Sequence, residues 1–351
     1  MNSSQSQIML EWYDAQKRDL PWRNSRDPYV IWVSEMMLQQ TQVNTVRPYF
    51  EHFIQMLPTI YDLADVDDEK LMKLWQGLGY YARVKNMKKA ATIIVDQYQG
   101  VFPNQKEDLL SLPGIGEYSS GAILSIAYDY SIPAIDGNVL RIFARLYNEQ
   151  EEVTLSATKK RLKEKVIMSL PIKRCGDYNQ ALMDLGATIC LGNGVPRCDE
   201  CPLQGQCSAK NNNTQRLIPK KAVKKVRLVE EWMILLIRYQ DQWLIHKRDN
   251  HGILSGMWEY PMLPVGSSID VIQWIESQNG RIQSASSSIT SNHLFTHREW
   301  KMRAWDIELN QFLNFPSNYR WVKLADIYDI YSIPMAFHAF TVHIEQISIH
   351  L

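Results

Sequence analysis

Apolar residues recur at helical spacing through about the first 210 residues of the chain. Residues 68–98 carry this pattern, and Gly77 and Gly79 interrupt it where we expect a loop between two helices. The stretches VLRIFARLY (139–147) and QALMDLGATIC (180–190) continue the same spacing, without strand-like alternation. Residues 1–210 are therefore predicted to form an all-α domain.

The pattern changes after residue 210. A polar, basic stretch at 211–228 is typical of a linker. The apolar run WMILLI (232–237) then starts the first of two predicted strands, which a turn at Gln240–Asp241 joins. A length of 351 residues also favours two domains over one.

Further strands and helices are predicted beyond this hairpin. The alternation in 299–309 shifts register at Ala304–Trp305, as it does in a bulged strand, and 321–327 is another short strand candidate. Residues 268–278 and 335–347 have helical spacing. We therefore expect residues 229–351 to form an α+β domain.

Charge and hydropathy limit the possible partners and the cellular location of the protein. Thirty-eight basic and 38 acidic residues give a net charge of zero, which speaks weakly against a nucleic-acid partner. The basic runs at 159–165 and 220–227 are most simply a solvated helix face and a linker. No apolar run reaches the length of a membrane span, and the amino terminus lacks the regions of a secretory signal. We expect a cytoplasmic protein with no membrane partner, and a monomer.

Four of the five cysteines fall within 18 residues: Cys190, Cys198, Cys201 and Cys207. In a reducing compartment this density indicates a metal site rather than disulfides. Four thiolates suit an iron–sulfur cluster or a tetrahedral zinc ion, and the spacing alone does not choose between them. Cys175 lies apart and is predicted to be an ordinary buried thiol.

The stretch LPGIGEYSS (112–120) predicts a tight turn between two helices. Gly114 and Gly116 allow positive φ and leave backbone N–H groups exposed at a helix start, which is a natural site for an anion such as a phosphate. A plain helix–helix turn explains the two glycines equally simply.

Several of these stretches together carry a resemblance to a known family. LPGIGEYSSGAI is similar to the helix-hairpin-helix of the endonuclease III superfamily of DNA glycosylases, in which a cysteine loop holds a 4Fe–4S cluster. The stretches at 20–43, 75–86 and 178–190 narrow the resemblance to adenine DNA glycosylases of the MutY type. It covers residues 8–210 densely and the second domain more thinly.

The resemblance implies a 4Fe–4S cluster on the four cysteines, with zinc as the alternative. The family usually has six residues between the first two cysteines, and this chain has seven. It also implies that Gly114 and Gly116 contact the backbone of duplex DNA, and that the protein is associated with the nucleoid.

Breaking the N-glycosidic bond of adenine requires a proton for the leaving base and a negative charge near the sugar, as two carboxyl groups can supply. Glu35 is the candidate acid. In a helix over 31–43 its neighbours are Ile31, Trp32 and Leu38. Their burial would raise the pKa of its carboxyl group and keep the proton available. The resemblance implies that Glu35 protonates adenine at N7.

Asp136 is the candidate partner for the sugar. It directly precedes the helix NVLRIFARL, where an N-cap is an equally good explanation, and a helix N-terminus favours its ionised form. The resemblance favours catalysis, with Asn138 orienting the carboxylate or the water.

Tyr118 stands where related bifunctional enzymes have a lysine that forms a Schiff base with the sugar. Because tyrosine cannot form one, we expect a monofunctional glycosylase that leaves an abasic site, with Tyr118 hydrogen-bonding Asp136.

The resemblance also implies substrate contacts. Trp22 and Arg23 would close over a flipped base, and Asp184 would lie near its N6/N7 edge, unless it is a solvated helix position. Gln40 and Tyr80 would wedge into the duplex, although core packing is a competing account of Tyr80.

The second domain resembles the Nudix-like domain of these glycosylases, but the glutamate-rich Nudix helix motif is absent from the sequence, so pyrophosphate cleavage is not expected. Phe295, Thr296 and His297 resemble the family's Phe-Ser-His loop, which recognises 8-oxoguanine. Without the resemblance, His297 would be an exposed loop histidine.

The sequence thus predicts a glycosylase that removes adenine opposite 8-oxoguanine or guanine in duplex DNA, in base excision repair. The alternatives are a thymine-mismatch or oxidised-pyrimidine glycosylase and a non-catalytic lesion-binding module. Glu35 and the predicted recognition domain disfavour the first alternative. The second alternative stays open, and the effect of Glu35→Gln on base release would distinguish it.

Overall fold

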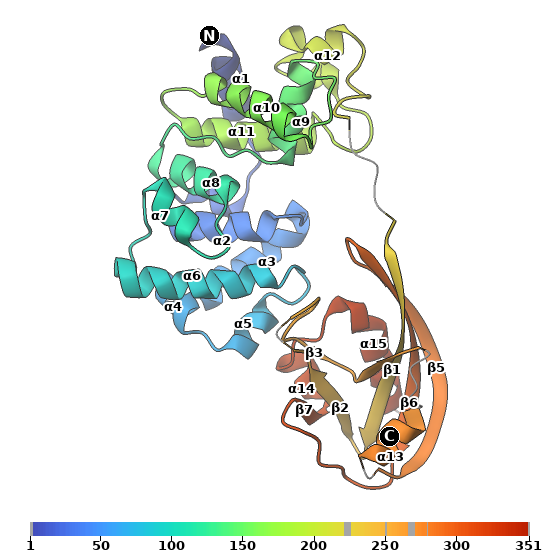
Figure 1. Cartoon of the computed structure of the whole chain (residues 1–351). Helices are drawn as coiled ribbons and strands as arrows, with labels where there is room; N and C mark the ends of the chain where they lie inside the picture. Colours follow the sequence, from blue (N-terminus) through green and yellow to red (C-terminus); the bar gives the residue numbers. More distant parts are fainter. Residues whose placement is uncertain (1–2, 221–225, 250, 266–270, 279, 350–351) are drawn as a thin grey trace. The chain divides into compact units, whose positions relative to one another are not determined.

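The computed structural model describes residues 3–220, 226–249, 251–265, 271–278 and 280–349 (Figure 1). Its contacts divide the chain into two compact units. The first, here the helical unit, contains residues 1–66 and 82–223. The second, the sheet unit, contains residues 67–81 and 224–351. Residues 67–81 thus pack with the carboxy-terminal part, although the predicted domain limits place them in the first domain.

The helical unit is built from α-helices and short 3-10 helices, as the apolar spacing predicted. They are α1 (Ser3–Gln16), η1 (Pro21–Asn24), α2 (Pro28–Leu38), α3 (Val43–Met56), α4 (Ile60–Asp65), α6 (Ala82–Tyr98), α7 (Lys106–Ser111), α8 (Glu117–Tyr128), α9 (Gly137–Leu146), α10 (Ser156–Ser169), α11 (Cys175–Thr188), η2 (Cys198–Glu200), η3 (Gln204–Gln206) and α12 (Ser208–Asn211). α11 contacts α1, α8 and α9 and so lies at the centre of one half of the unit (Figure 1).

The sheet unit combines one mixed sheet with flanking helices. Its elements are α5 (Asp68–Leu74), β1 (Leu228–Tyr239), β2 (Gln242–Lys247), β3 (Trp258–Glu259), β4 (Met262–Pro264), α13 (Val271–Ser277), β5 (Ile282–Leu294), β6 (Arg298–Leu309), β7 (Tyr319–Lys323), α14 (Leu324–Asp329), η4 (Met335–Phe337) and α15 (His338–Ile349). The strand order is β3-β2-β1-β6-β5, with β4 paired to β1 and β7 paired to β2. The predicted turn at Gln240–Asp241 joins β1 and β2, and Gln240 has φ +54°.

Both faces of this sheet are covered, which explains the continuous apolar run of β1. Ile234 and Leu236 belong to the core that contains Phe340 of α15. Leu235 and Ile237 belong to the opposite core, which contains Val271 of α13. A strand buried on both faces needs no polar alternation.

The predicted irregularity at Ala304–Trp305 is found at this place, but the extra residue is on the partner strand. β6 pairs with β1 in unbroken parallel register. The β5–β6 pairing shifts between Ile282 and Ser284 and again between Ser287 and Thr290 on β5, and the second shift lies opposite Ala304. The buried positions of β6 shift because Trp300 faces one core and Ile307 faces the other. The predicted strand at 321–327 is also only partly right, since β7 ends at Lys323 and the next six residues form α14.

The predicted linker at 211–228 is partly packed. Ile218 is 1% exposed and belongs to the core of the helical unit, where its carbonyl accepts a hydrogen bond from Arg145. Residues 221–225 of this segment, and 268–270 of the predicted helix at 268–278, lie outside the described residues. Within the described part of the chain, no helix has the length and apolar character needed to cross a membrane.

The two glycine-bearing turns form as predicted, with one correction. Gly77 and Gly79 have φ +101° and +70° in the loop between α5 and α6. In the turn between α7 and α8, Gly114 has φ +81°, whereas Gly116 has φ −105° and caps α8. Only Gly114 therefore uses the conformational freedom of glycine.

Replacing Gly114 by alanine is expected to lower the free energy of unfolding by about 1–3 kcal/mol, because the backbone is left-handed there. The new Cβ would also lie 2.9 Å from Cβ of Asn86. Gly116→Ala is the matched control, since no atom lies within 4 Å of its Cβ position and its backbone suits alanine, so its cost is about 1 kcal/mol or less. Denaturant unfolding of both variants measures the difference. Equal losses would show that the left-handed backbone of Gly114 is not the cause.

Candidate active site

A cavity of about 450 Å³ in the helical unit brings the predicted catalytic residues together. Its walls come from η1, α2, α8, α9 and α11. Its lining includes Trp22, Arg23, Glu35, Tyr118, Asp136 and Asn138, together with Arg18, Leu20, Ile31, Ser34, Leu38, Gln180 and Met183. Cavities of this size hold small organic ligands. The two carboxyl groups that the sequence singled out therefore face the same space.

Glu35 is buried in α2, with 4% of the residue exposed. Its helical neighbours Ile31 and Trp32 are buried as predicted. Desolvation raises the pKa of Glu35 to about 7, with a smaller upward contribution from Asp136. The expected raised pKa is thus present, and the carboxyl group is half protonated near neutral pH.

The helix that carries Glu35 is shorter than predicted. α2 ends at Leu38 rather than at residue 43, and Gln40 has φ +60°. Arg83 of α6, which is 9% exposed, donates from Nη1 to the carbonyl oxygen of Gln39 at 2.7 Å and also to that of Met36. A buried guanidinium therefore satisfies the carbonyl groups at the carboxyl end of α2.

Tyr118 contacts Glu35, and the predicted bond to Asp136 is wrong. Its hydroxyl group donates to Oε2 of Glu35 at 2.6 Å. Burial, followed by the charge of Glu35, raises the pKa of Tyr118 well above its usual value, so the hydroxyl stays a donor. This bond favours the ionised form of Glu35 and lowers its pKa, although desolvation has the larger effect. Tyr118 is the second residue of α8, just after the glycine turn, and its side chain lines the cavity.

Asp136 is the N-cap of α9, as the sequence allowed. Its Oδ1 accepts from the backbone N–H of Val139 at 2.8 Å, and its Oδ2 accepts from Nδ2 of Asn138 at 2.7 Å. The predicted orienting role of Asn138 is therefore supported by a direct bond. Burial raises the pKa of Asp136, while the bonds from Val139 and Asn138 lower it. The hydrogen bonds at the start of α9 lower the pKa of Asp136 by less than burial raises it. The sequence had predicted that the helix N-terminus would favour the ionised form, and the net effect on the pKa is the opposite.

Asp184 is not a solvated helix position, because only 1% of it is exposed. Its carboxylate accepts from both terminal nitrogens of Arg23 at 2.6 Å and from Nε of Arg18 at 2.6 Å. Asp184 is not among the residues that line the cavity, whereas both arginines are. The structure therefore favours a positioning role for Asp184, in place of the predicted contact with a base.

The aromatic wall of the cavity is buried and packed against a second ring. Trp22 is 6% exposed and packs edge-to-face against Phe50, with 5.3 Å between the ring centroids. Trp22 and Arg23 lie side by side in η1, so an indole ring and a guanidinium group border one side of the space. Their predicted contact with a base stays a prediction.

The other predicted contacts are divided between the two units. Gln40 follows α2 in the helical unit and is exposed. Tyr80 belongs to the sheet unit, has φ +49° and is 47% exposed, so core packing does not explain it. Its hydroxyl lies 3.0 Å from Oγ1 of Thr296. Left-handed backbone at a non-glycine residue is common at functional sites.

Phe295, Thr296 and His297 form the turn between β5 and β6. The backbone N–H of Phe295 donates to the carbonyl oxygen of Arg298 at 2.8 Å, and the Phe295 ring packs edge-to-face on Trp300. Thr296 and His297 are exposed at the tip. The turn can therefore present a hydroxyl and an imidazole to a ligand.

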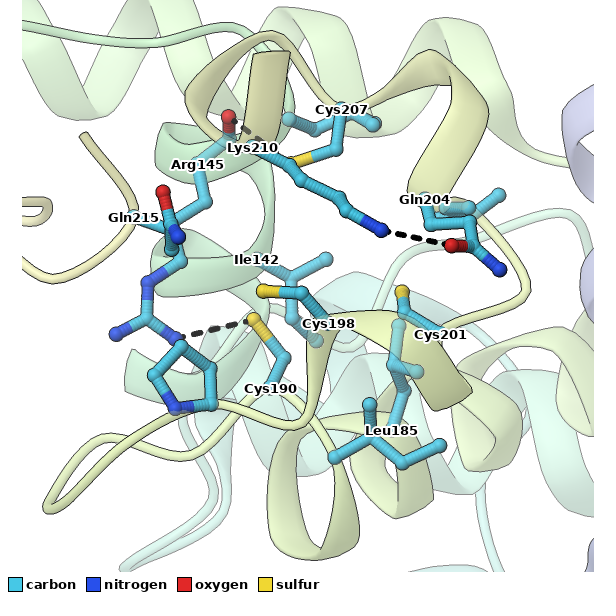
Figure 2. Close-up of a pocket in the computed structure, with 14 residues that line it drawn as sticks. Ile142, Arg145, Leu185, Cys190, Cys198, Cys201, Gln204, Cys207, Lys210 and Gln215 are labelled. Carbon is cyan, nitrogen blue, oxygen red and sulfur yellow. Dashed lines mark hydrogen bonds between the residues drawn. The ribbon is translucent and has the colours of Figure 1, made fainter. Parts of the chain in front are cut away.

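The four clustered cysteines line one small cavity of about 30 Å³ in the helical unit. Figure 2 shows their side chains pointing toward a common space, beside Arg145 and Lys210. Nη1 of Arg145 lies 3.2 Å from Sγ of Cys190 and donates to it. Within the described residues, however, no three His, Cys, Asp or Glu side chains converge closely enough to hold a metal ion. Cys175 lies elsewhere, fully buried, as predicted.

Sequence reasoning missed the residues that hold the site in place. Arg18 was not selected, although two arginines five residues apart flank the motif LPW and offered a signal. Arg83 was also missed, because nothing in the sequence shows that its side chain reaches back to α2. Ser119, whose hydroxyl accepts from Nε2 of Gln39 at 3.3 Å, carried no signal either.

Comparisons with known proteins agree with this arrangement. Residues 33–167 match the HhH-GPD superfamily of base excision DNA repair proteins, and residues 232–341 match a NUDIX domain. The adenine DNA glycosylase of Buchnera aphidicola subsp. Schizaphis graminum is 35% identical over 330 residues, which cover 93% of this chain and 94% of the relative. The human adenine DNA glycosylase is 33% identical over 307 residues, which cover 72% of this chain and 56% of the relative.

Solved structures show the same fold for the helical part. A thermostable thymine-DNA glycosylase is 27% identical with a TM-score of 0.54, over 59% of this chain and 95% of its own. An endonuclease III in a non-covalent DNA complex is 20% identical with a TM-score of 0.51, over 61% of this chain and 100% of its own. Fold and site together thus define a protein of the HhH-GPD base excision repair superfamily with an added Nudix-like domain. More narrowly, the chain belongs to the adenine DNA glycosylase family, as the sequence motifs predicted.

Replacing Tyr118 by phenylalanine is expected to raise the pKa of Glu35 above its value of about 7, because the lost hydroxyl stabilises the carboxylate. Carbon-13 NMR of the glutamate side-chain carboxyl groups measures this titration, and the Glu35→Gln variant assigns the signal. A Glu35 pKa that stays the same or falls in Tyr118→Phe would contradict the described contact.

Proposed function

We propose that this chain is a monofunctional DNA glycosylase that hydrolyses the N-glycosidic bond of adenine paired with 8-oxoguanine or guanine in duplex DNA. The observation that carries the proposal is the pair of carboxyl groups in one cavity. Glu35 is buried with a pKa near neutrality, and Asp136 is held by two hydrogen bonds. The family membership supports adenine as the base.

Glu35 supplies the proton. Adenine is a poor leaving group as an anion, so a general acid must protonate a ring nitrogen as the bond to the sugar breaks. A carboxyl group with an ordinary pKa would have lost its proton at neutral pH, whereas burial keeps about half of Glu35 protonated. When the proton leaves, the Tyr118 hydroxyl bonds to the resulting carboxylate and stabilises it.

Asp136 stabilises the sugar. Departure of the base leaves a positive, oxocarbenium-like deoxyribose, and a nearby carboxylate lowers the energy of that charge. The amide of Asn138 fixes the direction of the Asp136 carboxylate, so little reorganisation is needed during the reaction. Water then attacks the sugar, and an abasic site remains.

Tyr118 makes the reaction end there. Cleavage of the DNA strand by a bifunctional glycosylase needs an amine that forms a Schiff base with the sugar, and a phenol cannot form one. Among the residues that line the cavity, the described side chains include no lysine.

The base must leave the duplex to reach this cavity, because Glu35 is buried. Trp22 offers a flat apolar face for the extruded adenine, and Arg23, held by Asp184, offers donors. The turn with Gly114 presents the start of α8 to a DNA phosphate, which suits the backbone N–H groups of a helix N-terminus. Gln40 and Tyr80, both exposed with positive φ, would fill the space that the base leaves.

The base opposite the adenine would meet the β5–β6 turn. Thr296 and His297 are exposed there, and a hydroxyl and an imidazole can bond the groups that distinguish 8-oxoguanine from guanine. This role extends the proposal from adenine removal to recognition of the damaged partner base.

An iron–sulfur cluster suits the four cysteines better than zinc does. A zinc ion needs all four sulfurs about 2.3 Å from one point, and within the described residues no such group of three or more forms. A 4Fe–4S cluster spreads its cysteine ligands around a larger body. Cys190, Cys198, Cys201 and Cys207 would hold it, and it would supply a cross-link that fixes the loop after α11. The hydrogen bond that Arg145 donates to Sγ of Cys190 would stabilise the negative charge of a thiolate ligand.

The strand-cleavage assay tests the function. Duplexes with adenine opposite 8-oxoguanine, adenine opposite guanine, and thymine opposite guanine are incubated with the protein. Half of each sample is then treated with hot alkali, which cleaves the strand at abasic sites, and half is left untreated. We expect product from the two adenine duplexes only, and only after alkali. Cleavage without alkali at the rate of base release would contradict the monofunctional assignment, and removal of thymine alone would favour the mismatch alternative.

Glu35→Gln is expected to slow adenine release by about a hundredfold or more, because the amide carries no transferable proton. DNA binding, measured by fluorescence anisotropy, should stay within about threefold of the wild type, since one buried side chain changes little of the electrostatic contact. Glu51→Gln, at an exposed position of α3, is the matched control. A Glu35→Gln variant with full adenine release would contradict the assignment of Glu35 as the acid.

A further inference from the structure

Residues 67–81 lie between two helices of the helical unit in sequence, yet they pack with the sheet unit. α4 ends at Asp65 just before this segment, and α6 begins at Ala82 just after it. The segment is therefore tied to one unit by the covalent chain and to the other by side-chain contacts.

Glu69 of α5 makes the first of these contacts. One oxygen of its carboxylate accepts from the indole N–H of Trp258 at 2.9 Å, and the other accepts from Nζ of Lys247 at 2.5 Å. Trp258 is 1% exposed, so its N–H needs a protein partner, and a charged acceptor makes a strong one. The Lys247 side chain is 41% exposed, so its ion pair with Glu69 contributes less.

Three further hydrogen bonds join residues 67–81 to the rest of the sheet unit. Nε2 of Gln76 donates to the carbonyl oxygen of Ile333 at 2.7 Å, and the hydroxyl of Ser332 donates to the carbonyl oxygen of Met72 at 3.1 Å. Nζ of Lys73 lies 3.3 Å from the carbonyl oxygen of Ile327, in the last turn of α14, where a cation is favoured. Attachments spread from residue 69 to residue 76 thus hold the segment on the sheet unit.

This position places Tyr80 against the β5–β6 turn. Tyr80 is the second-last residue of the segment, and its hydroxyl lies 3.0 Å from Oγ1 of Thr296. Three residues after Tyr80, the Arg83 side chain donates hydrogen bonds to the carbonyl groups of Met36 and Gln39 at the end of α2. Glu35 directly precedes Met36 in this helix. Residues 69–83 thus contain one side chain that bonds the turn with Thr296 in the sheet unit and another that bonds the end of α2 in the helical unit.

We propose that Glu69 is a specificity-determining positioning residue. By anchoring residues 67–81 on the sheet unit, it holds Tyr80 beside Thr296, so that the identity of the base opposite the adenine affects the rate of excision. This inference rests on the proposed function, because it assumes adenine excision that depends on the opposite base. Glu69 itself touches neither the substrate nor the reacting atoms.

The test compares the full-length wild type with Glu69→Ala, Glu69→Gln and the control Glu51→Ala. Single-turnover excision of adenine is measured opposite 8-oxoguanine and opposite guanine, and the ratio of the two rates is the readout. Hydrogen exchange of peptides covering residues 67–81 reports the anchoring without any substrate.

In Glu69→Ala, we expect the preference for 8-oxoguanine to fall by about tenfold, equivalent to about 1.4 kcal/mol. Excision opposite guanine should stay within about twofold. Amides of residues 67–81 should exchange faster, while those of α2 and α9 should not. Glu69→Gln keeps an acceptor for Trp258 and should restore most of the preference, and Glu51→Ala should behave as the wild type.

A Glu69→Ala variant with an unchanged rate ratio would overturn the inference, with or without faster exchange. An equal loss of both rates would overturn it too, since that loss would indicate general damage to the fold. If the wild type itself excises no adenine, the proposed function fails, and the exchange data still report whether Glu69 anchors the segment.

Discussion

The burial of one carboxyl group is the constraint on which the rest of this structure depends. Glu35 lies in the last turns of α2, among apolar side chains, and its charge is stabilised by the Tyr118 hydroxyl and more weakly by Arg23. Such a group favours its protonated form at a pH where an exposed glutamate is ionised. A chain that keeps this group buried loses some stability as the pH rises from about 4.5, the ordinary pKa of the group, to about 7, and gains a proton donor.

The surroundings of Glu35 follow from that constraint. Arg83 closes the carboxyl end of its helix, and the turn at Gly114 delivers Tyr118 to its oxygen. Asp136 sits at the start of another helix, where hydrogen bonds support its charge against desolvation. Two carboxyl groups in one cavity are thereby given different environments, which is how a single site separates an acid from an electrostatic partner.

The sequence predicted the helical unit, the glycine turns, the strand pair after residue 228 and the burial of Glu35, because each depends on spacing within a few residues. It missed contacts between distant segments. The Tyr118 partner was assigned to Asp136 instead of Glu35, and Asp184 was not recognised as the clamp of two arginines. The extra residue of the irregularity beside Ala304 was placed on β6 instead of on β5. Residues 67–81 were placed with their sequence neighbours, since local apolar spacing does not show which core an amphipathic helix will join.

The central claim is that Glu35 must carry a proton when the base leaves. The pH dependence of single-turnover adenine release tests it most directly, measured on a duplex with adenine opposite 8-oxoguanine. The fraction of protonated Glu35 falls as the pH rises through its pKa of about 7, so the rate is predicted to decline by about tenfold for each further pH unit. A rate that stays constant from pH 6 to pH 9 in a folded protein would contradict the account.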